Sequence, residues 1–129
     1  KKLKVRFIGT IPSNEIIPST HSADATFVLV DPHNRNHRLT VYNKQFEAMV
    51  CGRPIICTKG TYSGEMTEEL NCGLTVEYDM ESIREAIIKL RDDPKLCETL
   101  GRNGLKAARE RYNWEVEKKN LLDVYGGME

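Results

Sequence analysis

Residues 54–58 read Pro-Ile-Ile-Cys-Thr, a short apolar run. Three further short runs that favour strands lie at 4–9, 26–30 and 73–77. The run at 26–30 is uniformly apolar, which is typical of a strand buried on both faces of a sheet. A helical pattern follows each of the four runs, and such alternation is typical of parallel sheets. The sequence therefore predicts an α/β fold: a parallel sheet with helices on both faces.

Polar residues that favour helix N-termini mark where the helices are expected to begin. These expected caps are Asn14, Asn43, Asp79, Asp93 (followed by Pro94) and Asn113. A Gly/Ser/Thr-rich turn at 59–64 is expected to precede a further helix at about 65–70. The last helix carries an apolar stripe, which we expect to pack against the rest of the domain rather than to bind a partner. The stripe consists of Trp114, Leu121, Leu122 and Tyr125.

The polar segment 31–42 is predicted to be a long loop without regular structure. Loops of this length are usually functional or disordered. Ligands of parallel α/β sheets bind beyond the carboxyl ends of the strands. We therefore expect the ligand site near the segments that follow Ile8, Val30, Thr58 and Glu77, with most weight on 31–42.

Composition and charge narrow the class of protein. The 129 residues fit one domain, and 19 Lys+Arg balance 19 Asp+Glu, which excludes a generally basic nucleic-acid binder. Residues 1–60 hold nine Lys+Arg against four Asp+Glu, while residues 61–129 hold ten against fifteen. The basic half suits a phosphate-bearing ligand, although charged helix faces in water explain it equally well. No apolar run approaches the roughly 20 residues of a membrane span.

The four cysteines form no C-x-x-C pair, and no histidine lies at zinc-ligand spacing from them. Cys51 and Cys57 flank an apolar run and are interpreted as small buried hydrophobic residues. Free thiols in a chain without a signal peptide are typical of a reducing, cytoplasmic setting. We expect no bound metal and no cofactor.

Several segments resemble, in the same order, the group 1 glycosyltransferases, which are retaining sugar transferases with two Rossmann domains. Residues 43–56 resemble the family's "lEAMacG-PvI" segment. In the segment that follows, Glu65 and Gly73 keep the family's spacing of eight residues. The remaining matches lie at 7–9, at 23–29 and at 111–114 together with Tyr125. This resemblance implies a Rossmann-like sheet.

The resemblance also implies a site for a nucleotide-diphospho-sugar donor. The matching glutamate of the family binds the donor's ribose, so the resemblance implies this role for Glu47. A helix that starts near Asn43 directs free N–H groups at an anion such as a diphosphate, and Lys44 adds a positive charge. The segment around Glu65 resembles the one that meets the donor's sugar, with the Gly60–Gly64 backbone beside it. Tyr42, Asn43, Lys44, Glu47, Thr61 and Glu65 are thus the candidate substrate-binding residues; no catalytic residue is assigned. The alternative interpretation, which the family pattern disfavours, is that Glu47 and Glu65 are only charges that complement a helix dipole.

Two departures from the family pattern stand out. The first glutamate of the usual Glu-x7-Glu pair is Leu39 here, and the Gly-rich stretch between the pair is replaced by residues 40–44. This resembles the family's "NK-fEaM" variant. The family's domain also normally begins two strand–helix units earlier, with an Arg and a Lys that clamp the diphosphate. We therefore expect residues 1–129 to be a single, N-terminally incomplete C-terminal donor-binding domain that is inactive alone.

In the complete protein, we expect an N-terminal acceptor domain, transfer with retention in glycan biosynthesis, and no nucleic-acid partner; peripheral membrane association is left open. The alternative is a non-catalytic Rossmann-like binding or interaction module. A phospho-accepting receiver domain is disfavoured, because the first and third runs end at Gly9 and Thr58-Lys59 rather than at acidic residues. A degenerate transferase domain kept for subunit contacts remains compatible with Leu39.

Overall fold

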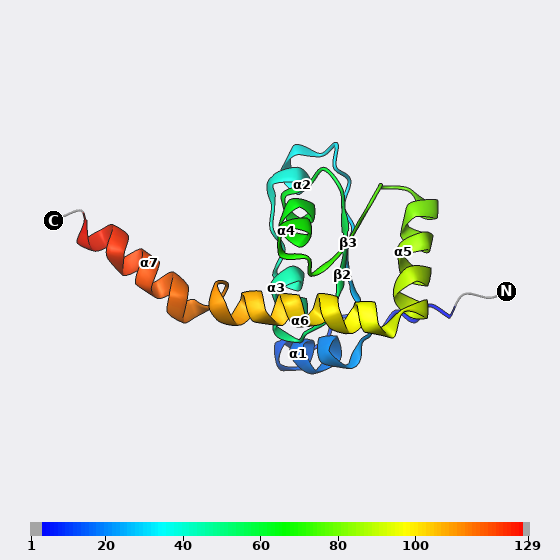
Figure 1. The fold of residues 1–129 in the computed structure, drawn as a ribbon, viewed down its shortest axis with the longest axis horizontal. Helices are drawn as coiled ribbons and strands as arrows, with labels where there is room; N and C mark the ends of the chain where they lie inside the picture. Colours follow the sequence, from blue (N-terminus) through cyan, green and yellow to red (C-terminus); the bar gives the residue numbers. More distant parts are fainter. Residues whose placement is uncertain (1–3, 128–129) are drawn as a thin grey trace.

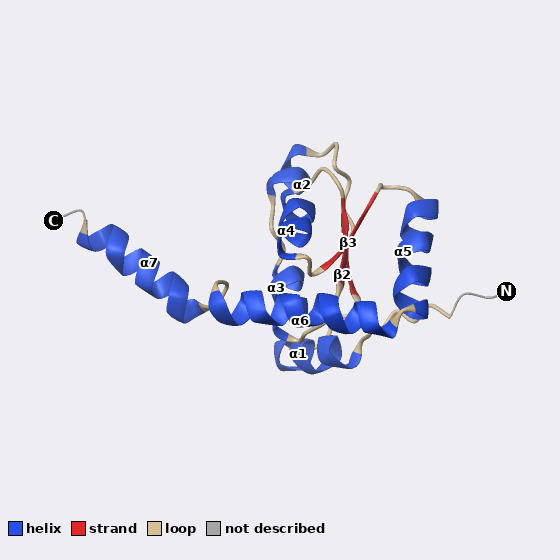
Figure 2. Cartoon of the chain, viewed as in Figure 1, coloured by secondary structure: helices blue, strands red, loops and turns tan. Residues whose placement is uncertain are grey.

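A three-stranded parallel sheet forms the centre of the computed structural model, which describes residues 4–127. The strands are β1 (Thr26–Val28), β2 (Ile55–Thr58) and β3 (Gly73–Val76), in the order β1-β2-β3. Both pairings are parallel, and every residue of the central strand β2 is buried. The predicted α/β fold with a parallel sheet is therefore confirmed, with its strands in red in Figure 2.

Helices cover both faces of this sheet (Figure 1). The helices are α1 (Ser13–Ser22), α2 (Arg35–Leu39), α3 (Asn43–Val50), α4 (Tyr62–Leu70), α5 (Met80–Asp92), α6 (Pro94–Glu110) and α7 (Trp114–Gly126). Helices α3 and α4 lie on one face and α5 on the other, while α6 runs across the amino ends of the strands and α7 projects away from the body. None of the described helices is both long enough and apolar enough to cross a bilayer.

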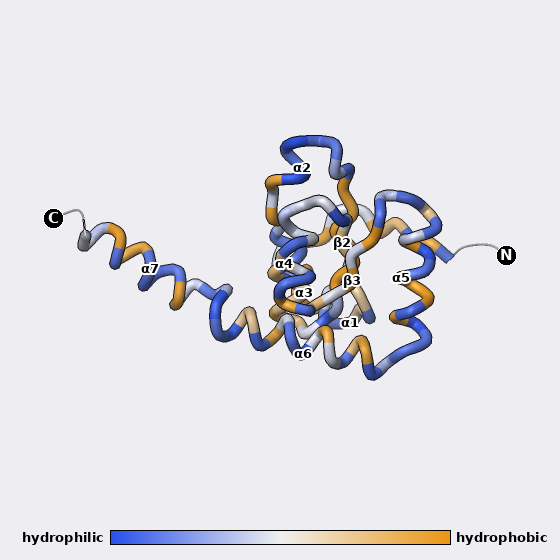
Figure 3. The backbone as a smooth tube through the Cα atoms, turned by 45° about the horizontal axis from the view of Figure 1, so that its top comes forward, coloured by the Kyte–Doolittle hydropathy of each residue, from blue (hydrophilic) through white to orange (hydrophobic). Residues whose placement is uncertain are grey.

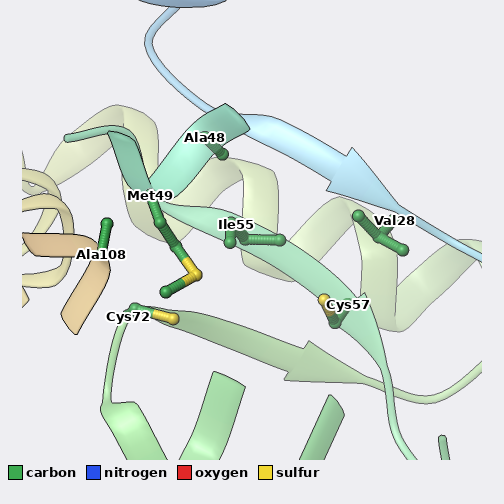
Figure 4. Close-up of a cluster of buried hydrophobic side chains, with 7 residues drawn as sticks. All are labelled: Val28, Ala48, Met49, Ile55, Cys57, Cys72 and Ala108. Atoms are coloured by element: carbon green, nitrogen blue, oxygen red, sulfur yellow. The ribbon is translucent and has the colours of Figure 1, made fainter. Parts of the chain in front are cut away.

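Two clusters of buried apolar side chains hold these layers together. The cluster on the α3 side is shown in Figure 4 and comprises Val28, Ala48, Met49, Ile55, Cys57, Cys72 and Ala108. The cluster on the α5 side comprises Ile56, Val76, Ala86, Leu90 and Leu100. Neighbouring residues of β2 enter different clusters because successive side chains of a strand point to opposite faces. Helix α6 contributes to both clusters, which explains why the longest helix is also well anchored.

The predicted caps are partly confirmed. The side chains of Asp79, Asp93 and Asn113 accept hydrogen bonds from the first turns of α5, α6 and α7. Asn14 and Asn43 were wrongly predicted as caps, since both residues already lie inside helices. A capping residue needs an extended backbone, and the residues immediately before α1 and α3 have that conformation instead.

Two loop predictions are also corrected. Helix α4 begins at Tyr62 rather than near 65, because the Thr61 side chain accepts a hydrogen bond from the Gly64 N–H. The segment 31–42 contains the short helix α2, because the Asn34 side chain accepts hydrogen bonds from two backbone N–H groups that follow it. The starts of α2 and α4 thus both depend on a side chain that accepts a hydrogen bond from the main chain of the first turn.

The strand predicted at 4–9 is wrong. Residues 4–12 have no regular secondary structure, and the side chains of Val5, Phe7 and Ile8 are 66%, 94% and 62% exposed. A strand needs a neighbour for its backbone hydrogen bonds. In the described sheet β1 pairs only with β2, so residues 4–9 have no partner.

The apolar stripe of α7 does not pack against the described domain. Trp114, Leu121, Leu122 and Tyr125 are all exposed, which contradicts the predicted packing within the domain. Apolar and polar segments alternate along α7 while it extends into solvent (Figure 3). The helix therefore owes its position to α6 and to the Asn113 cap rather than to a core contact.

The cysteines differ in accessibility, and this gives a first testable expectation. Cys57 and Cys72 are buried, and burial raises the pKa of each thiol to about 11. Burial raises the pKa of Cys51 and Cys97 as well, but both are half-buried. Because the reactive species is an accessible thiolate, we expect a thiol reagent at pH 8 to label Cys51 and Cys97 at least tenfold faster than the buried pair.

The measurement is mass spectrometry of the labelled peptides over time, with urea-unfolded protein as the control. In urea the four thiols should react at similar rates. Equal labelling of Cys57 and Cys51 in the folded protein is the result that contradicts the described core.

Candidate functional site

The carboxyl edge of the sheet brings together the loops that follow β1 and β2. The Val30 N–H donates to the Thr58 hydroxyl at 3.0 Å, which ties the end of one strand to the next. Gly60 has a φ of 75° and lies against Pro32, whose Cβ is 3.6 Å from the position that a Cβ on Gly60 would occupy. The two loops are thus in contact, so two of the four segments predicted to lie near the ligand site, those after Val30 and Thr58, meet at this edge.

Asp31 and His33 form a local pair at this edge. The Asp31 carboxylate accepts a hydrogen bond from the His33 N–H at 2.9 Å and lies 3.0 Å from its Nδ1. The backbone hydrogen bond, followed by that with the imidazole, lowers the pKa of Asp31 below its ordinary value. Asp31 therefore stays ionised near neutral pH and is already engaged by its own loop.

The N-terminus of α3 is open to a ligand. Five helices have a capping side chain that accepts a hydrogen bond from their first turn: Asn34, Thr61, Asp79, Asp93 and Asn113. Helix α3 begins after Tyr42, whose side chain makes no capping bond, and its first turn holds no acidic residue. Among helices of the described chain, only α1, which follows Pro12, shares the lack of a cap. The partial positive charge at the start of α3 is consequently not offset by a cap or a carboxylate.

The four candidates in and before α3 take different positions. Asn43 and Lys44 are exposed on the first turn. Glu47 is half-buried one turn further along the same helix. The Tyr42 ring packs against the buried cluster on the α3 side. The structure therefore brings two exposed polar groups and one half-buried carboxylate together on α3, whereas Tyr42 serves mainly as packing.

The two candidates at the start of α4, Thr61 before the helix and Glu65 within its first turn, differ in exposure. Thr61 is 1% exposed, and its hydroxyl donates to the Thr58 carbonyl at 2.7 Å while it accepts from the Gly64 N–H at 3.0 Å. The Thr61 hydroxyl is thus already engaged in hydrogen bonds within the protein, and we assign it no contact with a ligand. Glu65 is exposed on the first turn of α4.

The sequence interpretation missed Tyr62, an exposed aromatic side chain at the first residue of α4. An aromatic face there is able to stack on a base or a sugar ring. The signal was present in the turn at 59–64, where Tyr62 is the one aromatic residue, but only the true start of α4 places it at the helix end.

Two cavities of the described chain lie away from the six candidate residues. A cavity of about 850 Å³ opens at the amino ends of the strands and is lined in part by Asp24, Arg53, Ile56 and Cys97. A smaller one of about 250 Å³ lies between β3 and α5. None of the six candidate residues lines either cavity. In the described chain, no group of three or more His, Cys, Asp or Glu residues is arranged to hold a metal ion.

Comparison with known proteins identifies a family that this chain matches. Residues 1–123 match the family model described as "Glycosyl transferase-like". A probable sucrose-phosphate synthase 2 from Oryza sativa subsp. japonica is 38% identical over 59% of this chain and 8% of its own length. A GDP-mannose-dependent monoacylated alpha-(1-6)-phosphatidylinositol monomannoside mannosyltransferase from Corynebacterium glutamicum is 29% identical over 93% of this chain and 32% of its own.

The fold has a solved counterpart as well. A sucrose-phosphate synthase from Thermosynechococcus elongatus superposes with a TM-score of 0.80 at 24% identity, and covers 97% of this chain and 30% of its own. The chain thus spans less than a third of the mannosyltransferase and of this solved relative, and about a twelfth of the rice protein.

Proposed function

The chain belongs to the glycosyl transferase-like family, and from this premise we propose that it binds the nucleoside diphosphate part of a nucleotide-sugar donor at the N-terminus of α3. The observation that carries the proposal is the uncapped first turn of α3, which lies at the carboxyl edge of the sheet and exposes Asn43 and Lys44. Backbone N–H groups at a helix N-terminus, together with the helix dipole, are suited to a diphosphate.

In this arrangement each exposed group has a separate task. The Lys44 ammonium offsets the negative charge of the diphosphate, and the α3 amides donate hydrogen bonds to its oxygens. Glu47 lies one turn away, where its carboxylate accepts hydrogen bonds from the ribose hydroxyls. Tyr62 and Glu65, on the first turn of α4, face the sugar part of the donor.

Leu39 is consistent with a donor site that lacks the first glutamate of the usual pair. Its side chain is 62% exposed at the end of α2, so it is not retained as a core residue. An exposed leucine offers no hydrogen bond to a sugar hydroxyl. We infer that the remaining polar groups of α3 and α4 bind the donor without that carboxylate.

We further propose that the complete protein transfers the sugar to an acceptor with retention of configuration, as part of glycan biosynthesis. Stabilisation of the leaving diphosphate by the α3 N-terminus and Lys44 supplies electrostatic catalysis without a metal ion. Support comes from family membership and from the activities after which the relatives are named, sucrose-phosphate synthase and mannosyltransferase. A separate acceptor-binding domain completes the cleft in this proposal.

Calorimetric titration of UDP, GDP and ADP tests the proposed binding. We expect at least one to bind, and we expect Lys44→Ala to weaken that binding about three- to fivefold at low salt, with a smaller effect at high salt because exposed charges are screened. Lys89→Ala is the matched control, because Lys89 lies beside the smaller cavity on α5. Failure of all three nucleotides to bind at millimolar concentration contradicts the proposal and favours a non-catalytic interaction module.

The 129-residue chain alone is expected to transfer no sugar. The relatives that perform transfer are at least three times as long as the segment they share with this chain. The shared segment supplies donor contacts, whereas the chemistry also needs an oriented acceptor. Incubation with radiolabelled nucleotide sugars and mixed acceptors should give no glycosylated product. Turnover by the chain alone would place the acceptor site within these residues and contradict the proposed division of labour.

A further inference from the structure

Gln45 is a fully buried polar residue in the first turn of α3. Its side chain is 0% exposed, and its Nε2 donates to the Ser63 carbonyl at 3.2 Å and to the Thr67 hydroxyl at 3.0 Å. Ser63 is the second residue of α4, and Gln45 is the third residue of α3. A single buried amide therefore joins the first turns of two helices whose N-termini lie at the same edge of the sheet.

Further hydrogen bonds extend this link. The Ser63 hydroxyl donates to the Thr40 carbonyl, two residues before the Tyr42 cap position, at 3.2 Å. The Thr67 hydroxyl lies 2.8 Å from the Ser63 carbonyl and 3.3 Å from the Cys57 sulfur of β2. The chain entering α3, the start of α3, the start of α4 and the central strand are thus connected through one buried polar cluster.

Stability alone does not explain this polar cluster, because burying it costs free energy. Gln45 Oε1 is buried and has no hydrogen-bond partner among the described residues. A buried polar atom without a partner costs free energy that an apolar side chain of similar shape avoids. What the amide supplies, and an apolar side chain does not, is a directional bond that sets the distance between the two helix starts.

We propose that Gln45 is a positioning residue: by anchoring the first turn of α3 to α4, it holds the α3 amides and Lys44 in the position that binds a nucleoside diphosphate. The inference rests on the proposed function for its ligand, and on the buried hydrogen bonds for the link itself. Gln45 does not contact the ligand. It acts through the first turn of α3, which carries the amides and Lys44 on one side and leads to Glu47.

The decisive variant is Gln45→Met, which keeps the length of the side chain and removes both N–H donors. We expect its midpoint of urea unfolding to equal or exceed that of the parent. We also expect the amides of Phe46 to Met49 to exchange hydrogen about tenfold faster, since two hydrogen bonds to the α3 start are lost. Amides of β2 should exchange as in the parent.

The dissociation constant for UDP or GDP should rise about tenfold in Gln45→Met. Retained stability with weakened binding is not expected of a residue that merely fills the core. Ser63→Ala is the matched control: it removes the Thr40 bond only, because Gln45 binds the Ser63 main chain. It should change both readouts less than Gln45→Met does. If Gln45→Met does not fold, Thr67→Val removes one of the two acceptors and should give about half the change in exchange free energy.

Unchanged exchange of the α3 amides in Gln45→Met overturns the proposal. Faster exchange with an unchanged dissociation constant also overturns it, because the anchoring of the α3 first turn then does not matter to the ligand. A parent chain that binds no nucleoside diphosphate contradicts the proposed function instead, and the exchange measurement then decides by itself whether Gln45 holds the two helix starts.

Discussion

Glu47→Ala is expected to weaken binding of the nucleotide-sugar donor by tenfold or more. Glu47 is half-buried one turn into α3, next to the open N-terminus where the diphosphate is proposed to bind. A carboxylate there accepts hydrogen bonds from two ribose hydroxyls, and charge-assisted bonds contribute about 1.5–3 kcal/mol each. Loss of one such bond already corresponds to about a factor of ten at 1.4 kcal/mol per decade.

Glu47→Gln should weaken donor binding less than Glu47→Ala does, because the amide retains one acceptor oxygen and the shape of the side chain. Two carboxylates on α4 serve as controls, Glu68 and Glu69, which contact Thr75 and Arg111 at the surface. Their alanine variants should bind like the parent. Calorimetry or fluorescence titration of the complete protein and of this chain measures the series. If Glu47→Ala binds nucleotide as the parent does, its charge serves the helix dipole rather than ribose.

Gly101→Ala is expected to destabilise the fold by about 3 kcal/mol or more. Gly101 lies on α6 directly against the Gly52 carbonyl, in the turn between α3 and β2, and a Cβ there would overlap that carbonyl and its carbon. Both colliding groups are main chain, so α6 must move away from the sheet. Overpacking usually costs 1–3 kcal/mol and exceeds this where nothing can relax, which opposes the gain of about 1 kcal/mol in helix propensity.

Gly104→Ala and Gly126→Ala are graded controls for this effect. A Cβ at Gly104 would lie 3.3 Å from the Cys72 Cβ and 3.4 Å from the Met49 Cγ, much longer distances than those at Gly101, so Gly104→Ala should destabilise the fold by only about 1 kcal/mol. A Cβ at Gly126 meets nothing within 4 Å, and this variant should be neutral or slightly more stable. Urea unfolding monitored by circular dichroism ranks the three. Equal midpoints for Gly101→Ala and the parent contradict the packing of α6 on the Gly52 turn.

The fold was predictable where local pattern and tertiary packing agree. The apolar run at 54–58 corresponds to β2, whose residues are all buried, and such strands have a uniformly apolar composition. The run at 73–77 corresponds to β3, of which only Val76 is buried. The run at 4–9 has the same local preference but no neighbouring strand, and pairing is a property of two segments that one segment does not reveal. The packing predicted for the apolar stripe of α7 is wrong for the same reason, since nothing in the described chain covers the stripe.

The positions of the candidate residues were predictable to the level of the helix, but the orientation of each side chain was not. The family pattern pointed to Asn43, Lys44 and Glu47, and these three lie on one helix at the expected edge. The pattern did not separate Thr61, whose hydroxyl turns inward to cap α4, from residues that face solvent. Gln45 gave no signal, because a polar residue in a first helical turn is ordinarily exposed and only the packing of α3 on α4 buries it.

The central claim is that nucleoside diphosphates bind at the start of α3, and mapping of backbone amide chemical shifts during titration of the ¹⁵N-labelled chain with UDP, GDP and ADP tests it most directly. The account predicts that the largest shifts fall on Asn43, Lys44 and Glu47, with smaller ones in the loops after β1 and β2. Shifts confined to the large cavity at the opposite edge, around Arg53 and Cys97, would contradict it, as would no shift for any of the three nucleotides.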